Sequence, residues 1–134
     1  MNLYVEIIAI IVAVMGVIVS ALIYAHTVRR ERKLDTMREF SRIREKFPEV
    51  LQLDSQEKEI MQYLTEMERF CTGVNLNLYD WKIINKMSGN RLISQYRGFT
   101  KEFIKSRPDL SDGSRPYSEY TTLMEKLIEK RCNK

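Results

Sequence analysis

Residues 7–25 form an uncharged apolar run of 19 residues, and this run limits what the chain can fold into more than any other feature. At a rise of about 1.5 Å per residue, a helix of this length spans roughly 28 Å, which is close to the hydrocarbon thickness of a bilayer. Lipid offers the backbone no other hydrogen-bonding partner, so the segment must be helical there. A buried helix of a soluble protein usually keeps a polar face, and this run has none. We predict an N-terminal transmembrane anchor over residues 1–28.

The flanks of the run argue against a cleaved signal peptide and orient the span. The start, Met-Asn-Leu-Tyr-Val-Glu, has no basic side chain, and the apolar run is longer than the core of a signal peptide. A basic cluster follows the run, consisting of Arg29, Arg30, Arg32 and Lys33. Because basic residues beside a span stay in the cytoplasm, we expect the N-terminus outside and the C-terminal domain inside. The same cluster can bind anionic headgroups at the membrane surface.

Small residues gather on one face of the predicted span: Ala9, Ala13, Gly16 and Ser20. Steps of four, three and four residues keep them on one side of a helix. Small side chains let two helices approach closely in lipid, so this face can be a self-association seam. The alternative is that such a pattern arises by chance in a single-pass anchor, and the sequence leaves both readings open.

The rest of the chain, residues 29–134, predicts a small helical domain. No Gly or Pro lies between Tyr24 and Phe47, and apolar side chains recur every three or four residues there: Leu34, Met37, Phe40, Ile43 and Phe47. This pattern predicts that the membrane helix continues into a stalk over residues 29–47, which Pro48 ends.

A bundle of shorter helices is predicted over residues 54–132. Asp54 is typical of a helix cap, and the helix that it begins ends near Gly73. Three more helices are expected, over 78–87, 91–106 and 117–130, with a break at Ser88-Gly89-Asn90 and a loop at 107–116. No segment alternates polar and apolar residues over the length of a strand. The predicted fold class is therefore all-α.

Charge and cysteine content restrict function only weakly. The chain has 22 Lys and Arg against 18 Asp and Glu, and since Glu6 precedes the span, the remainder carries about +5. That excess suits an anionic membrane, a nucleic acid or an acidic partner and selects none of them. Cys71 and Cys132 lie far apart, and in the reducing cytoplasm we expect free thiols rather than a disulfide.

The sequence offers no catalytic centre. His26, the single histidine, lies at the membrane edge, which removes nucleophilic sites that need an imidazole base and zinc sites with several histidines. No glycine-rich phosphate loop is present. Glu66 and Glu68 flank Met67 on a helix and point to different sides. We expect no metal and no cofactor.

Two features allow a structural or a functional interpretation. Asp80 and Trp81 begin a predicted helix, where we expect a cap and a core anchor. Four basic residues on the following helix form a candidate nucleic-acid surface together with Tyr96 and Phe99: Arg91, Arg97, Lys101 and Lys105. A solvated helix face is the simpler interpretation of these four.

Three stretches carry a resemblance to a known family. They are residues 63–74 (Tyr-Leu-Thr-Glu-Met-Glu-Arg-Phe-Cys-Thr-Gly-Val), residues 78–93, and the run Tyr96…Phe99…Phe103-Ile104 followed by Pro116-Tyr117. From about Arg30 onward the chain resembles the bacterial DUF4760 family, whose function is unknown. The resemblance implies an all-helical cytoplasmic domain and a place in the bacterial inner membrane, and it brings no catalytic residue. Proteins of this layout also occur as membrane effectors in phage defence, an analogy of architecture alone.

Two functions follow as hypotheses. The first is a non-enzymatic single-pass membrane protein that self-associates in the lipid bilayer and acts by binding a protein partner or perturbing the membrane, as a pore or effector in phage defence. The alternative is a membrane-tethered module that binds nucleic acid or a nucleotide.

Overall fold

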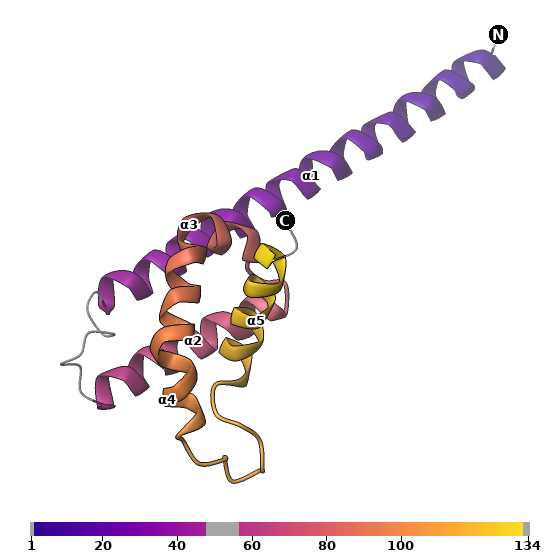
Figure 1. The fold of residues 1–134 in the computed structure, drawn as a ribbon. Helices are drawn as coiled ribbons and strands as arrows, with labels where there is room; N and C mark the ends of the chain where they lie inside the picture. Colours follow the sequence, from indigo (N-terminus) through magenta and orange to yellow (C-terminus); the bar gives the residue numbers. More distant parts are fainter. Residues whose placement is uncertain (1, 48–56, 133–134) are drawn as a thin grey trace. The chain divides into compact units, whose positions relative to one another are not determined.

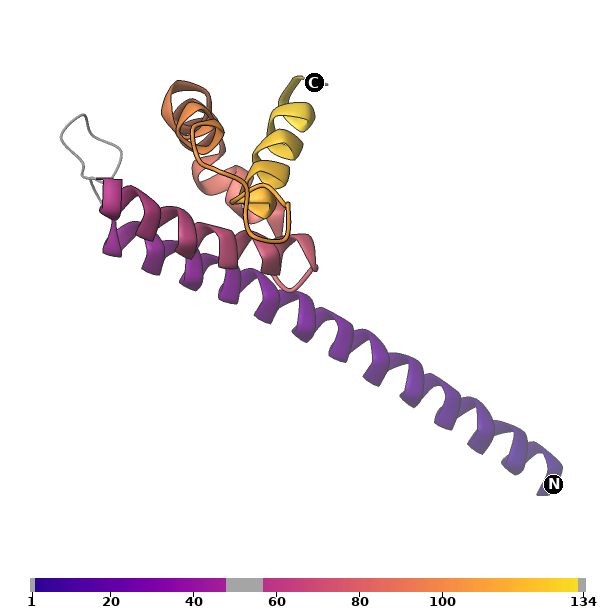
Figure 2. The same cartoon turned by 90° about the horizontal axis from the view of Figure 1, so that it is seen from below.

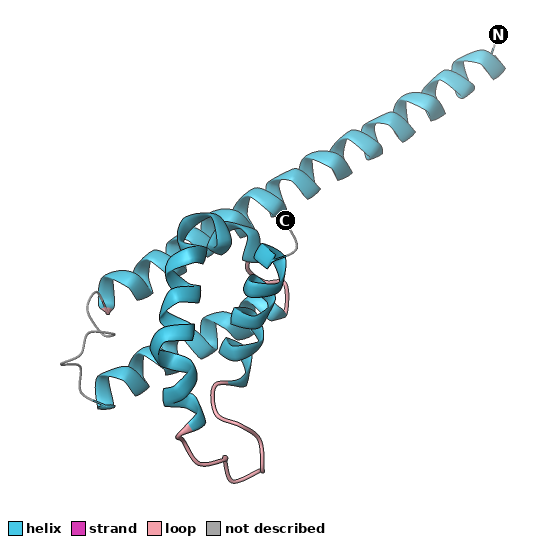
Figure 3. Cartoon of the chain, viewed as in Figure 1, coloured by secondary structure: helices cyan, strands magenta, loops and turns pink. Residues whose placement is uncertain are grey.

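The computed structural model describes residues 2–47 and 57–132, and every regular element in these two ranges is a helix (Figures 1 and 3). The elements are α1 (Asn2–Lys46), α2 (Glu57–Asn75), α3 (Trp81–Gln95), the π-helical turn η1 (Tyr96–Thr100), α4 (Lys101–Lys105) and α5 (Ser118–Cys132). The predicted all-α fold is confirmed. The predicted cap at Asp54 lies outside the described residues.

The chain divides into two compact units, Met1–Arg32 and Lys33–Lys134, and α1 crosses the boundary between them. The N-terminal unit consists of a single helix that is long and apolar enough to cross a membrane. Its large apolar side chains are all exposed, from Leu3 at 67% to Tyr24 at 73%. The predicted helix therefore runs unbroken from Asn2 to Lys46 and ends one residue before the expected Phe47.

In the C-terminal unit, α2 runs antiparallel to the last turns of α1 (Figure 2). Phe47, directly after α1, contacts Tyr63 of α2 with ring centroids 5.8 Å apart. Phe40, earlier in α1, contacts Phe70 of α2 with ring centroids 5.9 Å apart. The buried core that these helices share with α3, η1, α4 and α5 comprises Phe40, Ile43, Ile60, Tyr63, Leu64, Met67, Phe70, Cys71, Val74, Ile84, Leu92, Ile93, Tyr96, Ile104, Tyr120, Leu123, Met124 and Leu127.

Only part of the apolar stripe of α1 is buried. Phe40 and Ile43 lie in the core, whereas Leu34 and Met37 are 45% and 43% exposed. Thr36 is fully buried instead, and its hydroxyl accepts the backbone N–H of Asp80 at 2.8 Å. The stripe that faces the core thus runs through residues 36, 40, 43 and 47. Because Thr36 is polar, the spacing of apolar residues does not identify it as the first buried position.

The predicted break at Ser88-Gly89-Asn90 is confirmed. Element α3 consists of two helical segments that meet in a kink at Ser88, whose backbone is non-helical (φ −154°, ψ 22°). Arg131 of α5 packs against the kink and donates hydrogen bonds to the Asn85 carbonyl at 3.0 Å and to the Asn85 side chain at 2.9 Å. Gly89 leaves the room that the guanidinium occupies, since a Cβ there would collide with it. A distant residue of α5 therefore packs against the kink between the two helical segments.

The start of α3 agrees with the sequence. Asp80 is the N-cap, and its carboxylate accepts the backbone N–H of Lys82 at 3.0 Å. Trp81 packs half-buried against the core, with the Lys126 ammonium 4.8 Å from its ring centroid. The predicted roles of cap and anchor are confirmed, although the helix begins three residues later than expected.

A π-helical turn interrupts the helix predicted over 91–106. The Lys101 N–H bonds the Tyr96 carbonyl, five residues back, and the turn places the Thr100 hydroxyl 3.0 Å from the Tyr120 hydroxyl in the core. Burial raises the pKa of Tyr120, so this phenol stays protonated. The extra residue in the turn rotates everything after it, which changes which side chains share a face.

Candidate functional site

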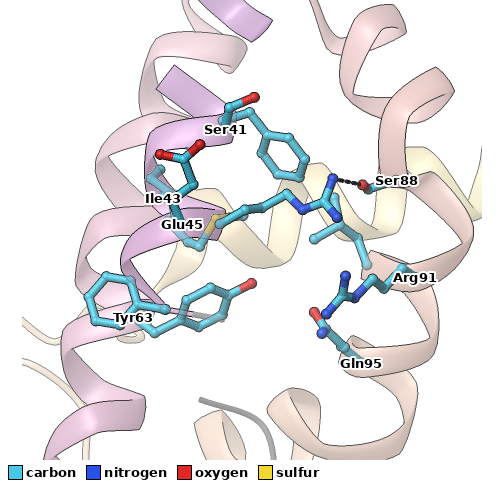
Figure 4. A pocket seen from close by; sticks show the side chains of 12 residues that line it. Ser41, Ile43, Glu45, Tyr63, Ser88, Arg91 and Gln95 are labelled. Atoms are coloured by element: carbon cyan, nitrogen blue, oxygen red, sulfur yellow. Dashed lines mark hydrogen bonds between the residues drawn. The ribbon is translucent and has the colours of Figure 1, made fainter. Parts of the chain in front are cut away.

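The C-terminal unit contains a cavity of about 440 Å³ between α1, α2 and α3, open to solvent (Figure 4). Five of the lining residues are apolar and are together called the apolar wall: Phe40, Ile43, Phe47, Met67 and Leu92. The remaining seven are polar and are together called the polar wall: Ser41, Arg44, Glu45, Tyr63, Ser88, Arg91 and Gln95. A volume of this size is within the range of small-molecule sites in proteins, roughly 300–1,000 Å³.

Arg44 is held in place from two sides. It comes from the inner edge of α1, four residues after Phe40, and its guanidinium lies 5.8 Å from the Phe40 ring centroid. Its Nη1 donates to the Ser88 hydroxyl at 3.1 Å, across the cavity, as Figure 4 shows. A guanidinium has five N–H donors, so most of them remain for another acceptor.

The kink in α3 supplies the group that holds Arg44. Ser88 sits at the non-helical position, with its residue 9% exposed, and its hydroxyl accepts the bond from Arg44. A serine inside a regular helix usually bonds back to its own backbone or points to solvent. Here the irregular backbone directs it toward α1, so the kink contributes directly to the geometry of the cavity.

Arg91 and Gln95 enter the cavity from one face of α3, being four residues apart. In Figure 4 both side chains extend toward the hydroxyl of Tyr63, which comes from α2. Burial raises the pKa of Tyr63 to about 12, although the charges of Arg91 and Arg44 act in the opposite direction. At neutral pH the phenol is therefore protonated and can donate a hydrogen bond.

Together these groups make the polar wall rich in donors. Two guanidinium groups face one carboxylate, that of Glu45, and neither Arg44 nor Arg91 forms an ion pair with any described residue. The twelve lining residues include no histidine or cysteine. Such a wall is suited to binding an anion. Across the described residues, no group of three or more His, Cys, Asp or Glu is placed to hold a metal ion.

Most of this site was missed by the sequence. Of its polar residues only Arg91 was singled out, as part of a nucleic-acid surface. Arg44, Ser88 and Gln95 come together only because α1 and α3 approach each other across α2. One local signal was available: Ser88-Gly89 interrupts an otherwise helical pattern, and irregular helices often mark functional sites.

The four predicted nucleic-acid residues are divided among three elements. Arg91 is on α3, Arg97 on η1, and Lys101 and Lys105 on α4. All four are exposed, but only Arg91 lines the cavity, and Lys105 lies 3.9 Å from Glu102 of its own helix. A nucleic-acid surface made of these residues stays a prediction.

The two predicted sites near the membrane lie on α1. Ala9, Ala13, Gly16 and Ser20 are exposed, and a Cβ on Gly16 would meet no atom within 4 Å. In the basic cluster Arg29, Arg30 and Lys33 are exposed and Arg32 is half-buried. Self-association and headgroup binding at these positions stay predictions.

Comparison with known proteins places the chain by family alone. No curated protein and no solved structure matches it. A family of sequences described as a domain of unknown function, DUF4760, matches residues 5–127. The match thus includes the apolar helix, whereas the resemblance noted above began near Arg30. This chain belongs to the DUF4760 family.

Proposed function

We propose that this chain is a non-enzymatic single-pass membrane protein of the bacterial inner membrane, which holds its helical domain at the cytoplasmic surface and self-associates through its span. The observation that carries the proposal is the surface of α1. From Leu3 to Tyr24 the helix exposes every large apolar side chain, among them Val12 at 65% and Leu22 at 65%. A contiguous apolar surface of this extent is not stable in water and calls for lipid or other copies of the helix.

The orientation can be tested through Cys132. This thiol is exposed near the C-terminus, whereas Cys71 is buried. A membrane-impermeant maleimide added to intact bacterial spheroplasts should leave Cys132 unlabelled and should label it after the membrane is permeabilised. In a matched control, Asn2→Cys combined with Cys132→Ser should be labelled without permeabilisation. The reverse pattern would overturn the orientation, and loss of the protein from the membrane fraction would overturn the anchor.

Self-association follows from the small face of the span. The residues Ala9, Ala13, Gly16 and Ser20 leave one side of the helix without bulk, so two backbones can approach there. The basic cluster and the polar residues after it stay at the membrane surface. Within the bilayer, the small face is the side of the helix where the backbones of two spans can pack closely.

Crosslinking and native mass spectrometry of the full chain in a nonionic detergent test this part. Wild-type protein should give oligomers, and Gly16→Leu should shift them toward monomer. Ile18→Leu is the matched control, because two residues along a helix turn about 200° and place the change on the opposite side. A wild-type protein that is strictly monomeric would overturn self-association. If oligomers persist in Gly16→Leu but are lost in Ile18→Leu, the self-association face lies on the side of Ile18 rather than on the small face.

A role as a membrane effector in phage defence is part of the proposal and rests on the layout of anchor and helical domain. Expression of the chain in a phage-sensitive strain should lower plaque counts or, on activation, permeabilise the membrane to an impermeant dye. Unchanged plaque counts and an intact membrane under both conditions would overturn this role.

A further inference from the structure

The cavity between α1, α2 and α3 has features that neither membrane anchoring nor self-association uses. Arg44 and Arg91 come from different helices and converge on one concave surface. Surface arginines are usually solvated singly or paired with acids. Here two of them share a concave site without an ion pair to any described residue, while six other basic residues of the same unit do form ion pairs: Arg38, Arg42, Lys46, Lys105, Arg107 and Arg115.

The donors in the cavity are already oriented. Stacking on Phe40 and the hydrogen bond to Ser88 fix the Arg44 guanidinium before any ligand arrives. The protonated Tyr63 hydroxyl adds a donor from α2. Preorganised donors bind more tightly than mobile ones, because less side-chain entropy is lost on binding.

The donors favour an anion with several acceptor oxygens. The lining carries two positive charges, Arg44 and Arg91, and one negative charge, Glu45. A phosphate monoester has three acceptor oxygens and about −1.5 to −2 charges at neutral pH, so it can accept from both guanidinium groups at once. Arginine also binds phosphate oxygens through two parallel N–H groups, a geometry that lysine does not offer.

The apolar wall selects what the phosphate is attached to. Phe40, Phe47 and Met67 also line the cavity. A bare inorganic ion would leave this wall in water, whereas an ester with an aromatic or aliphatic body would cover it. A pocket with an apolar wall and a few convergent polar groups is typical of a small-molecule site.

We propose that this cavity binds a phosphate monoester, with Arg44 and Arg91 holding the phosphate and Phe40, Phe47 and Met67 contacting the apolar body. The apolar part of the ligand can be that of a soluble nucleotide or of a lipid. Both present the same phosphate monoester to the two arginines. The site belongs to the C-terminal unit alone, so it does not depend on whether the span self-associates.

Binding can be measured on the full chain in a nonionic detergent, by calorimetry and by the rise in unfolding temperature that a bound ligand produces. Trp81, the single tryptophan, packs between α3 and α5 and reports unfolding of the helical domain. The probes are adenosine 5′-monophosphate, adenosine and inorganic phosphate. Phosphatidic acid in phosphatidylcholine nanodiscs, against nanodiscs without it, is the lipid arm.

We expect one of the two esters to bind saturably and more tightly than adenosine or inorganic phosphate. Arg44→Gln and Arg91→Gln should each weaken its binding by about tenfold or more. Arg97→Gln, which removes the same charge from an exposed position outside the cavity, should leave the dissociation constant within about twofold of wild type. Arg91 forms no ion pair with a described residue, so its variant should keep the wild-type unfolding temperature and remain informative if Arg44→Gln is destabilised.

Each other result counts against the proposal. No saturable binding of either ester would overturn it, as would binding that Arg91→Gln leaves unchanged. Equal weakening by Arg97→Gln would mean attraction to net charge rather than a site. If inorganic phosphate binds as tightly as both esters, the apolar wall does not contribute to binding, and this part of the proposal is overturned. Preference between the nucleotide and the lipid then identifies the source of the ligand, and either preference supports the proposal.

Discussion

Glu68, in the middle of α2, caps the first turn of α5 by accepting the backbone N–H of Tyr120 at 2.8 Å. Its second carboxylate oxygen accepts the N–H of Glu119 at 3.0 Å. The first N–H groups of a helix have no partner within the helix, and an acidic group there also complements the helix dipole. One side chain of α2 therefore satisfies the start of α5, which follows it by about fifty residues in the sequence.

Replacing Glu68 should destabilise the helical domain. Glu68→Ala leaves two half-buried donors without their acceptor, and we expect the free energy of unfolding to fall by about 1–2 kcal/mol. Urea unfolding in nonionic detergent, followed by Trp81 fluorescence, measures this change. Glu125→Ala is the control, because Glu125 is exposed on α5. If both variants lose the same stability, the cap contributes nothing.

The sequence predicted the positions of the helices well because those depend on local pattern. Each helix is predicted by residues within or next to it. Examples are the long uncharged run, the stalk without Gly or Pro, Asp80 before Trp81 and the apolar face of the last helix. The spacing of the last helix puts Tyr120, Leu123, Met124, Leu127 and Ile128 on one face; the first four are buried and Ile128 is partly buried. Glu66 and Glu68 point to different sides, as expected: Glu66 to Arg42 and Lys46, Glu68 to α5.

The features that could not be predicted depend on contacts between distant segments. The sequence predicts the break at Ser88-Gly89-Asn90, but it does not predict that Arg131 of α5 packs against it. The π turn brings Thr100 to Tyr120, and the hydrogen bond from Arg44 to Ser88 joins α1 to α3 at the cavity. In each case the partner lies twenty or more residues away, where periodicity carries no information.

Thr36 offers a second test of a contact that the apolar pattern concealed. Its hydroxyl is buried and accepts the Asp80 N–H, which fixes the start of α3 against α1. Thr36→Val keeps the shape of the side chain but removes the acceptor, and we expect a loss of about 1–3 kcal/mol in the free energy of unfolding. Thr36→Ser is the matched control, since it keeps the hydroxyl and loses only a methyl group. A free energy of unfolding for Thr36→Val equal to that of Thr36→Ser would contradict the prediction.

The two cysteines should differ in reactivity. Burial, followed by the charges of Glu68 and Glu119, raises the pKa of the Cys71 thiol well above its usual value, so it holds little thiolate at neutral pH. Cys132 is exposed. We expect Ellman's reagent to react quickly with one thiol in the folded protein and with two after denaturation. Cys132→Ser should abolish the fast reaction, and Cys71→Ala should preserve it. A fast reaction in Cys132→Ser would mean that the core around α2 opens readily.

The ion pairs of Glu66 predict how stability depends on pH. Hydrogen bonds from Arg42, and after it from Lys46, lower the pKa of Glu66 below its ordinary value near 4.5. The folded protein therefore binds this proton less readily than the unfolded chain does, and the pairs stabilise the fold above that ordinary value. Their contribution disappears as the pH falls through the lowered pKa of the folded state.

Glu66→Gln isolates this contribution. At pH 7 the variant should unfold at a lower temperature than wild type, by at most about 5 °C because the pairs are at the surface. Added salt should reduce the difference, because it screens exposed charges. As the pH is lowered below the ordinary glutamate range, the two unfolding temperatures should converge. Glu129→Gln, which removes an exposed carboxylate from α5 that forms no ion pair with a described residue, should follow the wild-type curve throughout. A difference between Glu66→Gln and wild type that persisted unchanged at acidic pH would show that Glu66 acts through packing rather than through its charge.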